Sequence, residues 1–474
     1  MLNQCAPEEA GVRSEGIMDF LDDMKQKHLH LHGLMILRHG QVIAHASFAP
    51  WRSGDLHMLF SLSKSFTSTA VGFAVQDGLL RLTDKLVDFF PEHLPCKPCE
   101  NMQKITVKHL LTMNTGHGQE PWHQSDCWEK DFLRSYVEFE PGTHFLYNTF
   151  GTYMLAAVVQ KVTGKKLLHY LREKWMDPLG MSGDIWWEES PTGVATGGYG
   201  LNVRLEDIAK MGQFYLQKGV WEGKRLLNEQ WILDAQTAWS DNSTPGEPPS
   251  DWGCGYGYQF WMCQPEHVYR GDGAFGQYCI ILPDQDMVIA INSGVEDMGA
   301  VMRSIWDRIL PAVGDVCPPS DKLKERLAHT VTPARWEDRE KETAAPVPDS
   351  GWLGRYLLTP GNSQGIDRIE IRQQQVILTL RGRETALPLD RETWQPFSMA
   401  FGDPNADANH YLEQAAVRAA RKENALILHI CYTRTPFEDV LKLTFTPHGV
   451  QIHGMRNVGF GPSPAFDLTG IRED

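Results

Sequence analysis

A serine and a lysine stand three residues apart in the segment Ser61-Leu62-Ser63-Lys64. On the first turn of a helix, residues at this spacing point the same way, and a helix N-terminus stabilises nearby negative charge. A serine hydroxyl is a weak nucleophile until a neighbouring base accepts its proton. A lysine can be that base only when burial or another cation lowers its pKa. The pair therefore indicates nucleophilic acyl chemistry, although S-x-x-K alone also opens many ordinary helices.

Two later segments carry further polar groups at the ends of regular elements. The first is Pro141–Thr149, which runs into an apolar helix that we expect to end near Gly164. The second is Gly271–Tyr278, which reads as a glycine-rich strand start, with the apolar run Cys279–Leu282 behind it as a buried strand. The chain thus offers a serine, a lysine, a tyrosine and a glycine-rich strand in a fixed order.

That order resembles the serine β-lactamase and penicillin-binding-protein superfamily. It looks most like the class C-type branch, which also contains esterases and D-aminopeptidases. Further motifs typical of that branch are Phe60–Thr67, Gly78–Leu80 with Asp84-Lys85, His109–Thr112, and the run from Gly197 to Ala209. The resemblance covers about residues 5–312 and does not extend to the last third of the chain.

The resemblance implies a role for each candidate. Ser61 would attack a carbonyl group and form an acyl-enzyme. Lys64 would accept the Ser61 proton or tune the surrounding network. Tyr147 would relay a proton to the leaving group or serve as the base itself, and the sequence leaves this choice open. Backbone N–H groups of Ser61 and of a residue near Ala274 on the edge strand would bind the oxyanion. The expected substrate-binding residues are Asn148, Thr149, Asp272, Gly273 and Ala274.

Two departures from the family pattern bear on specificity. The usual Y-x-N motif ends here in Thr149, whose hydroxyl cannot reproduce the hydrogen-bond pair of an amide, unless Asn148 replaces it through a rotated turn. Asp272 takes the place of the cation that recognises a substrate carboxylate, so we expect an amine or a neutral group to be preferred. Two alternatives stay open: Arg270 restores anion binding, or Asp272 pairs with Arg270 and contacts no substrate.

These residues need a frame of strands and helices. Leu34–Ala44 reads as one hairpin, and Tyr278–Leu282 with Met287–Asn292 reads as a second. Leu205–Leu216 has helical periodicity, and in the irregular segment 114–140 we expect Trp122 and Trp128 to line a cleft. As the resemblance implies, we predict an α+β fold in which an antiparallel sheet is flanked by helices and a helical region is inserted.

The last third of the chain has a different pattern. From Gly351 onward, short alternating segments indicate a small β-barrel or sandwich. We therefore predict a hydrolase domain at 1–315, a linker with one short helix at 316–349, and a β-rich domain at 350–474. No catalytic set appears in the β-rich domain, so we expect it to have a packing or cleft-covering role.

Composition narrows the class of partner. The net charge of −15 and the pI of about 5.6 argue against nucleic acid and anionic membranes as partners. No apolar run is long enough to cross a bilayer, and the first residues lack a signal-peptide pattern, so we expect a cytoplasmic protein. The expected partner is a small ester, amide or short peptide. Acyl-chain preference, β-lactamase activity and oligomeric state are not specified by the sequence.

Cysteine and histidine residues give no metal or cofactor signal. The nine cysteines are an odd, scattered set, which favours free thiols. Cys96 and Cys99 form a C-x-x-C motif without the second pair that a zinc site needs. His28, His30 and His32 alternate before a strand without a nearby carboxylate or cysteine, which favours a solvated strand edge. We predict a hydrolase that works without metal or cofactor.

Overall fold

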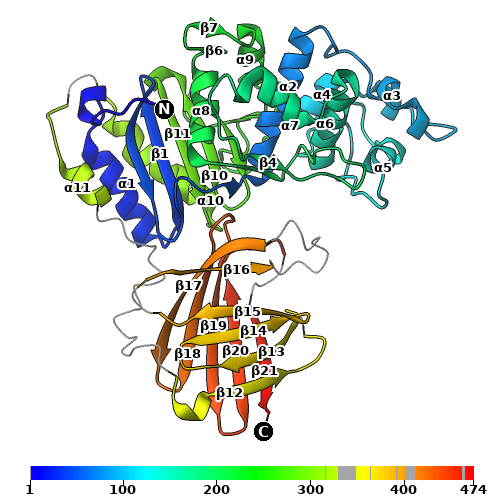
Figure 1. Cartoon of the computed structure of the whole chain (residues 1–474). Helices are drawn as coiled ribbons and strands as arrows, with labels where there is room; N and C mark the ends of the chain where they lie inside the picture. The colour runs from blue at the N-terminus through cyan, green and yellow to red at the C-terminus, as the bar shows by residue number, and fades with distance from the viewer. Residues whose placement is uncertain are drawn as a thin grey trace.

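The chain forms two large antiparallel sheets, one in its N-terminal part and one in its C-terminal part (Figure 1). A computed structural model describes residues 2–244, 246–314, 317–328, 348–362, 364–390, 393–400, 412–461 and 465–473. Residues 329–347 of the predicted linker lie outside this set, and α11 (Lys322–Ala328) precedes them. The predicted α+β architecture with a C-terminal β-barrel or sandwich is confirmed. Of these two alternatives, the C-terminal sheet forms a barrel.

The N-terminal sheet has six strands in the order β2-β1-β11-β10-β9-β8. Their bounds are β1 Leu31–Arg38, β2 Gln41–Ser47, β8 Trp261–Met262, β9 Tyr269–Gly273, β10 Gln277–Leu282 and β11 Met287–Ser293. Both predicted hairpins are present, and β1 pairs with β11 in the register Ile36 to Ile289. The first and last strands of this part, β1 and β11, are therefore neighbours in the sheet, and the segments between them in sequence leave the sheet and return to it.

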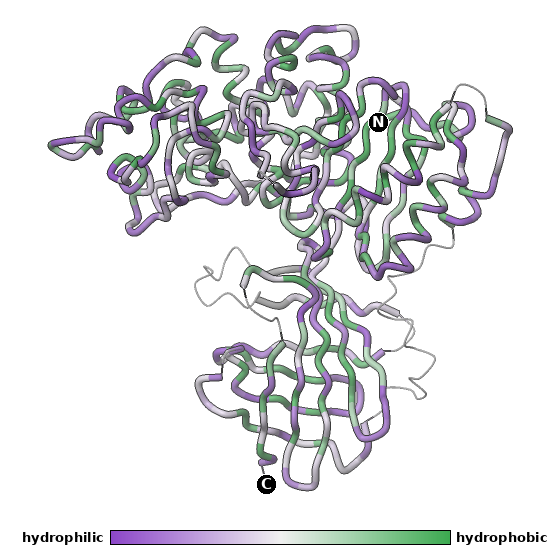
Figure 2. Tube along the Cα trace, turned by 180° about the vertical axis from the view of Figure 1, so that it is seen from behind, coloured by the Kyte–Doolittle hydropathy of each residue, from purple (hydrophilic) through white to green (hydrophobic). Residues whose placement is uncertain are grey.

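Helices cover both faces of this sheet. Every residue of β1, β10 and β11 is buried, and neighbouring side chains along a strand point to opposite faces. Ile281 packs in the core on the face of α8 (Leu205–Leu216), whereas Ile280 packs on the other face with α1 (Ser14–Gln26). Beside α1 lie α10 (Met298–Ser304), η7 (Ile305–Ile309) and η8 (Leu310–Ala312). The short turn η1 (Glu8–Ala10) precedes α1 in the chain, and η6 (Pro283–Gln285) joins β10 to β11. Figure 2 shows the resulting concentration of hydrophobic residues along these strands.

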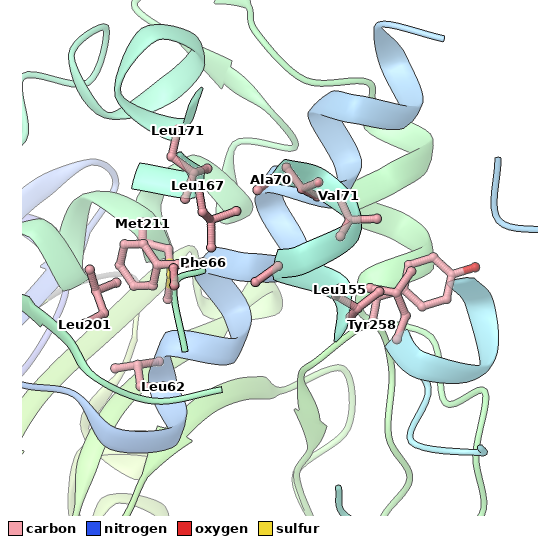
Figure 3. Close-up of a cluster of buried hydrophobic side chains, with 14 of the residues drawn as sticks. Leu62, Phe66, Ala70, Val71, Leu155, Leu167, Leu171, Leu201, Met211 and Tyr258 are labelled. Carbon is pink, nitrogen blue, oxygen red and sulfur yellow. The ribbon is translucent and has the colours of Figure 1, made fainter. Parts of the chain in front are cut away.

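The inserted helical region surrounds α2 (Ser63–Gln76). Residues Ser63–Ala74 of α2 are all buried, so no side of these turns faces solvent. Figure 3 shows Phe66 and Ala70 among leucines from α7 (Leu167–Leu171) and Met211 from α8. The other elements of this region are β3 His57–Met58, η2 Phe60–Leu62, α3 Leu86–Phe89, η3 Pro91–His93, η4 Met102–Lys104, α4 Val107–Leu111, α5 Trp128–Arg134, α6 Thr149–Thr163, η5 Arg172–Met176, β4 Trp186–Trp187, β5 Leu201–Val203, β6 Val220–Trp221, β7 Lys224–Arg225 and α9 Glu229–Ala235.

The C-terminal sheet is a nearly closed barrel of ten antiparallel strands, in the order β15-β14-β13-β12-β21-β20-β19-β18-β17-β16. A short turn, η10 (Ser350–Trp352), precedes it. The strands are β12 Gly354–Leu358, β13 Ile366–Ile371, β14 Gln375–Leu380, β15 Arg383–Pro388, β16 Gln395–Ala400, β17 Leu412–Lys422, β18 Ala425–Tyr432, β19 Glu438–Thr446, β20 Gly449–Arg456 and β21 Ala465–Arg472. Buried and exposed residues alternate along β20 and β21, as expected for strands with one face toward a barrel interior.

One sequence prediction fails where the two parts meet. His30 and His32 are not on a solvated edge: each is 2% exposed, and His30 Nδ1 lies 3.0 Å from Oε1 of Glu438 in the barrel. His32 Nδ1 lies 3.1 Å from Nε2 of His57.

The nine cysteines are free, as predicted. Among the described residues, no helix combines the length and apolar character needed to span a membrane.

Candidate active site

Ser61 lies in η2, the short turn that leads from β3 into α2. This places it just before the first turn of the long helix rather than within that turn. The Leu59 N–H donates to the Leu201 carbonyl oxygen at 2.9 Å, and the Ser65 hydroxyl donates to the Gln259 carbonyl oxygen at 2.9 Å. The turn η2 and the start of α2 are thereby tied to β5 and to the segment before β8, while Ser61 itself stays partly exposed.

Lys64 lies behind Ser61 and is 1% exposed. Its Nζ is 3.1 Å from Ser61 Oγ, 2.8 Å from the Gly198 carbonyl oxygen and 3.4 Å from Thr149 Oγ1. Burial lowers the pKa of Lys64 to about 7, although the charges of Glu120 and Asp272 act in the opposite direction. A neutral amine can donate to the latter two oxygens and turn its lone pair toward Ser61. These contacts and this pKa are what a general base for a serine hydroxyl requires.

Tyr147 lies next to both Lys64 and Ser61. Its ring stacks on Trp261 with a centroid distance of 5.1 Å, and Lys64 Nζ lies 4.8 Å from the centre of the Tyr147 ring. Burial and the nearby Asp272 charge raise the pKa of Tyr147 above its ordinary value, while a hydrogen bond with Ser61 acts in the opposite direction. Tyr147 therefore keeps its proton at neutral pH and can act as a donor.

Thr149 and Asn148 have different environments. Thr149 is the first residue of α6, and its hydroxyl faces Lys64 at the distance given above. Asn148 is fully buried, and its Oδ1 accepts the Gly151 N–H at 2.9 Å, which makes it the N-cap of α6. Because Asn148 caps the helix from inside, the side chain on the cleft side of this motif is that of Thr149.

Glu120 is a neighbour of the site that the sequence prediction missed. Its Oε1 accepts the Thr149 N–H at 2.5 Å, and its charge raises the pKa of both Lys64 and Tyr147. It lies in the irregular segment that was expected to line a cleft, and no periodic pattern singled it out. Among the described residues, no lysine, arginine or histidine forms an ion pair with Glu120.

The glycine-rich segment lies against η2 and the start of α2. A side chain at Gly273 would overlap the Leu59 carbonyl oxygen, and one at Gly271 would overlap Ser65. Glycine is therefore required for the close approach of β9 to η2. Gly271–Gly273 end β9, and Gln277 and Tyr278 of the same segment begin the buried strand β10, as predicted. Ala274 lies in the turn between β9 and β10 rather than on an edge strand.

Asp272 is paired with Arg270 inside the protein. The Nε of Arg270 donates to Asp272 Oδ2 at 2.9 Å, and the second terminal nitrogen of Arg270 forms an ion pair with the same oxygen at 2.8 Å. Arg270 is fully buried, its other terminal nitrogen donates to the Asp251 carbonyl oxygen at 2.7 Å, and Asp272 is 6% exposed. Of the alternatives left open by the sequence, this geometry matches the internal ion pair, and the Arg270 fork does not reach the cleft.

A hollow of about 700 Å³ extends from Glu120 over the segment around α5. Trp122 and Tyr136, which line it, are 67% and 75% exposed, so aromatic surface is available beside the carboxylate. The expectation that Trp128 also lines a cleft is wrong, because Trp128 is buried in the hydrophobic core. No cluster of three or more histidine, cysteine, aspartate or glutamate side chains suited to a metal ion occurs among the described residues.

A family model described as Beta-lactamase matches residues 20–313, which is more than half of the chain. The 6-aminohexanoate-dimer hydrolase of Paenarthrobacter ureafaciens is 24% identical over 311 residues, covering 60% of this chain and 78% of that protein. Penicillin-binding protein 4 of Amycolatopsis lactamdurans is 24% identical over 313 residues, covering 55% of this chain and 76% of that protein.

A solved structure, the octameric penicillin-binding protein homologue from Pyrococcus abyssi, shares the fold over nearly the whole chain. It has a TM-score of 0.51 and 16% identity, and the match covers 96% of this chain and 99% of that one. The predicted resemblance is thereby confirmed. The chain belongs to the β-lactamase family of serine hydrolases.

Proposed function

We propose that the protein hydrolyses small esters or amides through an acyl-enzyme on Ser61. The observation that carries the proposal is the 3.1 Å contact between Ser61 Oγ and Lys64 Nζ, together with a lysine pKa of about 7. About half of such a lysine is neutral at pH 7, and it can accept a proton. Lys64 is therefore our choice of base, and Tyr147 our choice of proton donor.

In the proposed cycle, neutral Lys64 takes the Ser61 proton as Oγ bonds to the substrate carbonyl carbon. The N–H groups of Ser61 and Ala274 stabilise the oxyanion. Tyr147 donates its proton to the leaving alcohol or amine. The Lys64 ammonium then passes a proton to the Tyr147 oxygen, which leaves Lys64 neutral again. Water then attacks the acyl-enzyme by the same route, so no metal or cofactor is required.

Charge near the site favours substrates that carry an amine. The Asp272 carboxylate is already balanced by Arg270, whereas Glu120 faces the hollow without an ion-pair partner among the described residues. We therefore assign ammonium recognition to Glu120 rather than to Asp272. Hydrolysis of an amine-bearing amide is in keeping with the name of the 6-aminohexanoate-dimer hydrolase relative and with the D-aminopeptidase-like alternative.

A second candidate is a penicillin-binding or acyl-trapping sensor with little turnover, since a penicillin-binding protein is among the relatives. A p-nitrophenyl ester separates the two. Sustained nitrophenol release supports the enzyme, and a single stoichiometric burst supports the trap. No release from wild type, or equal release from Ser61→Ala, would contradict both.

The charge assignment is tested with two p-nitroanilides of equal acyl length, one ending in an ammonium group and one in a methyl group. Glu120→Gln keeps an oxygen that can accept the Thr149 N–H but removes the charge. We expect kcat/KM to fall about tenfold for the ammonium substrate and to change little for the neutral one. Glu138→Gln, at another carboxylate of the hollow, is the matched control. An equal loss on both substrates would contradict the assignment.

We also propose the division of the chain into a hydrolase domain at 1–315, a linker at 316–349 and a β-rich domain at 350–474. The described sheets support it, because β11 ends at Ser293 and the barrel strands begin at Gly354.

A further inference from the structure

Two phenylalanines next to the reaction centre have left-handed backbone conformations. Phe60, directly before Ser61, has φ of 48°, and Phe275, directly after Ala274, has φ of 65°. For a bulky side chain this region of backbone space is strained and persists only where the surroundings hold it. The two residues flank the backbone N–H groups proposed to bind the oxyanion. Whatever fixes these two turns therefore fixes the direction of those N–H groups.

The side chains of both residues pack on the barrel. The Phe60 ring lies edge-on to the Phe275 ring at a centroid distance of 5.5 Å. Phe437, from the turn between β18 and β19, lies 6.2 Å from the Phe60 ring and 5.7 Å from the Phe275 ring. Phe460 also contacts both rings but is 75% exposed, whereas Phe437 is 8% exposed. Phe275 is in fact part of the barrel's own hydrophobic core cluster, with Phe60 and Ala274 packed against it.

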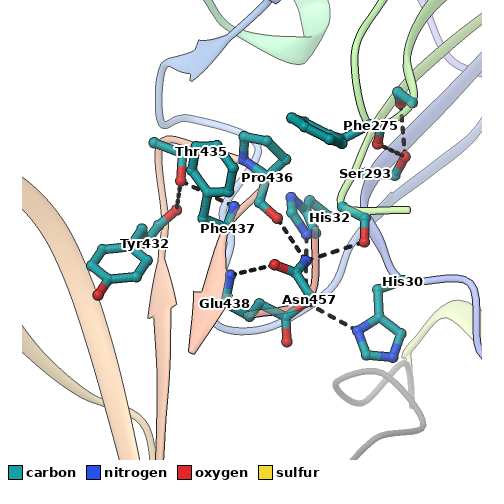
Figure 4. A network of polar contacts seen from close by, with 12 residues as sticks. His30, His32, Phe275, Ser293, Tyr432, Thr435, Pro436, Phe437, Glu438 and Asn457 are labelled. Atoms are coloured by element: carbon teal, nitrogen blue, oxygen red, sulfur yellow. Dashed lines mark hydrogen bonds and ion pairs between the residues drawn. The ribbon is translucent and has the colours of Figure 1, made fainter. Parts of the chain in front are cut away.

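Polar contacts hold the Phe437 turn against the hydrolase part, as Figure 4 shows. Met58 lies three residues before Ser61, and its N–H donates to the Arg434 carbonyl oxygen at 2.8 Å. Asn457 Nδ2 donates to the Gly294 and Pro436 carbonyl oxygens at 3.2 and 2.8 Å, joining the end of β11 to the turn.

A glycine is needed where this turn meets the sheet, because a Cβ at Gly294 would overlap the Pro436 carbonyl oxygen. From the same sheet end, Ser293 Oγ donates to the carbonyl oxygens of Phe275 and Gly276 at 3.0 and 2.8 Å. A continuous set of contacts thus runs from the barrel turn to both flanks of the proposed oxyanion site.

We propose that the barrel completes the active site, with Phe437 as a positioning residue that holds the left-handed turns at Phe60 and Phe275. Phe437 acts through these two residues and does not contact the substrate. The proposal rests on the proposed function, because it assumes that Ser61 is the nucleophile and that the Ser61 and Ala274 N–H groups bind the oxyanion. It goes beyond the expected packing or cleft-covering role of the C-terminal part.

The test is Phe437→Ala in the full chain, with kcat expressed per active site titrated by a fluorophosphonate that labels nucleophilic serines. A misdirected oxyanion site weakens binding of the transition state more than that of the substrate, so we expect kcat to fall about 10- to 100-fold with KM within about threefold. Phe437→Leu, which keeps apolar contact in the turn, should recover most of that loss. Expressing kcat per titrated site also separates the proposed effect from simple misfolding, because unfolded molecules are not titrated.

The matched control is Phe445→Ala, which removes an equally buried barrel phenylalanine that stacks on Trp352 instead. We expect it to lower thermal stability and to leave kcat per titrated site unchanged. Unchanged kcat per site in Phe437→Ala, or an equal fall in both variants, would overturn the proposal. Failure of the probe to label wild type, or equal labelling of Ser61→Ala, would instead refute Ser61 as the nucleophile and hence the proposed function.

Discussion

The surroundings of Lys64 and those of Arg456 show two ways in which this protein holds a cation away from solvent, since Lys64 is buried and the Arg456 side chain is half-buried. Arg456, at the end of barrel strand β20, reaches both carboxylate oxygens of Asp439 at 2.8 Å. Although burial disfavours its charge, the hydrogen bonds and charge of Asp439 raise the pKa of Arg456. Lys64 instead contacts a hydroxyl, a carbonyl oxygen and a second hydroxyl, and burial lowers its pKa to about 7.

The difference indicates which buried charges have a structural role and which have a chemical one. A buried cation with a carboxylate partner remains charged and ties elements together. A buried lysine whose contacts are neutral oxygens loses its proton readily and becomes a base. The same contrast separates Asp272, which is paired with Arg270, from Glu120, for which the described part of the chain supplies no ion-pair partner. The following predictions test this contrast, from the largest expected effect to the smallest.

Ser61→Ala should reduce ester hydrolysis at least about 10³-fold, because no other group can form the acyl-enzyme. Circular dichroism and the melting temperature should stay close to those of wild type, since Ser61 is partly exposed in its turn. A variant that keeps more than a few per cent of wild-type turnover would place the nucleophile elsewhere.

Lys64→Ala should reduce kcat about 10²- to 10⁴-fold, the scale of a lost proton-transfer group. Lys210→Ala is its control, because Lys210 is also largely buried and donates to the Gly180 carbonyl oxygen at 2.6 Å, but it pairs with Glu206. We expect the control to keep wild-type kcat. Full activity in Lys64→Ala would remove this lysine from the mechanism.

Tyr147→Phe should reduce kcat about 10²-fold, because the leaving group loses its proton donor while the ring keeps its stacking on Trp261. The loss should be smaller for a good leaving group such as nitrophenol than for an aliphatic amine. Tyr356→Phe removes a buried hydroxyl bonded to the Trp352 carbonyl oxygen in the barrel, and should cost stability only. The same loss on both leaving groups would argue against proton donation.

The pH profile should follow the protonation of Lys64. Its pKa is lowered to about 7, so the lysine is neutral above that pH and protonated below it. We expect kcat/KM to be flat above about pH 7 and to fall about tenfold per pH unit below it. Because the Glu120 charge raises this pKa, Glu120→Gln should move the midpoint to lower pH. A midpoint that stays fixed in Glu120→Gln, or that rises, would contradict this electrostatic account.

Chelators should have no effect. The described residues contain no cluster of metal-ligating side chains, and the proposed cycle uses none. Incubation with EDTA should leave kcat within experimental error. Loss of turnover that zinc restores would show a metal requirement and break the contrast between Lys64 and Arg456, because a cation other than Lys64 would then drive the chemistry.

Local motifs allowed the site and half of the fold to be predicted. Ser61 and Lys64 are neighbours in sequence, and Tyr147 precedes a helix with a clear apolar pattern and a terminal glycine, so their placement follows from short-range rules. The two hairpins of the first sheet were predictable for the same reason. Strand alternation in the last third indicated β-structure but could not distinguish a barrel from a sandwich, because closure depends on pairing between distant strands.

Long-range partners account for the rest. His30 meets Glu438, which lies 408 residues away, so a segment read by itself looked solvated. Glu120 lies in an irregular loop, and its contact with Thr149 exists only in the folded chain. The pairing of Asp272 with Arg270 was foreseen as an alternative, because residues two apart on a strand share a face. The left-handed conformations of Phe60 and Phe275 had no sequence signal, since glycine is the residue expected there.

The central claim is that a neutral Lys64 activates Ser61, and the most direct measurement is the mass of the trapped acyl-enzyme. Wild type is mixed with a p-nitrophenyl ester, quenched in acid within milliseconds at pH 8 and at pH 5, and digested for mass spectrometry. The account predicts one acyl group on the peptide that contains Ser61, formed about 100-fold more slowly at pH 5, and none in Ser61→Ala. An acyl group on another residue, or equal rates of acylation at the two pH values, would contradict it.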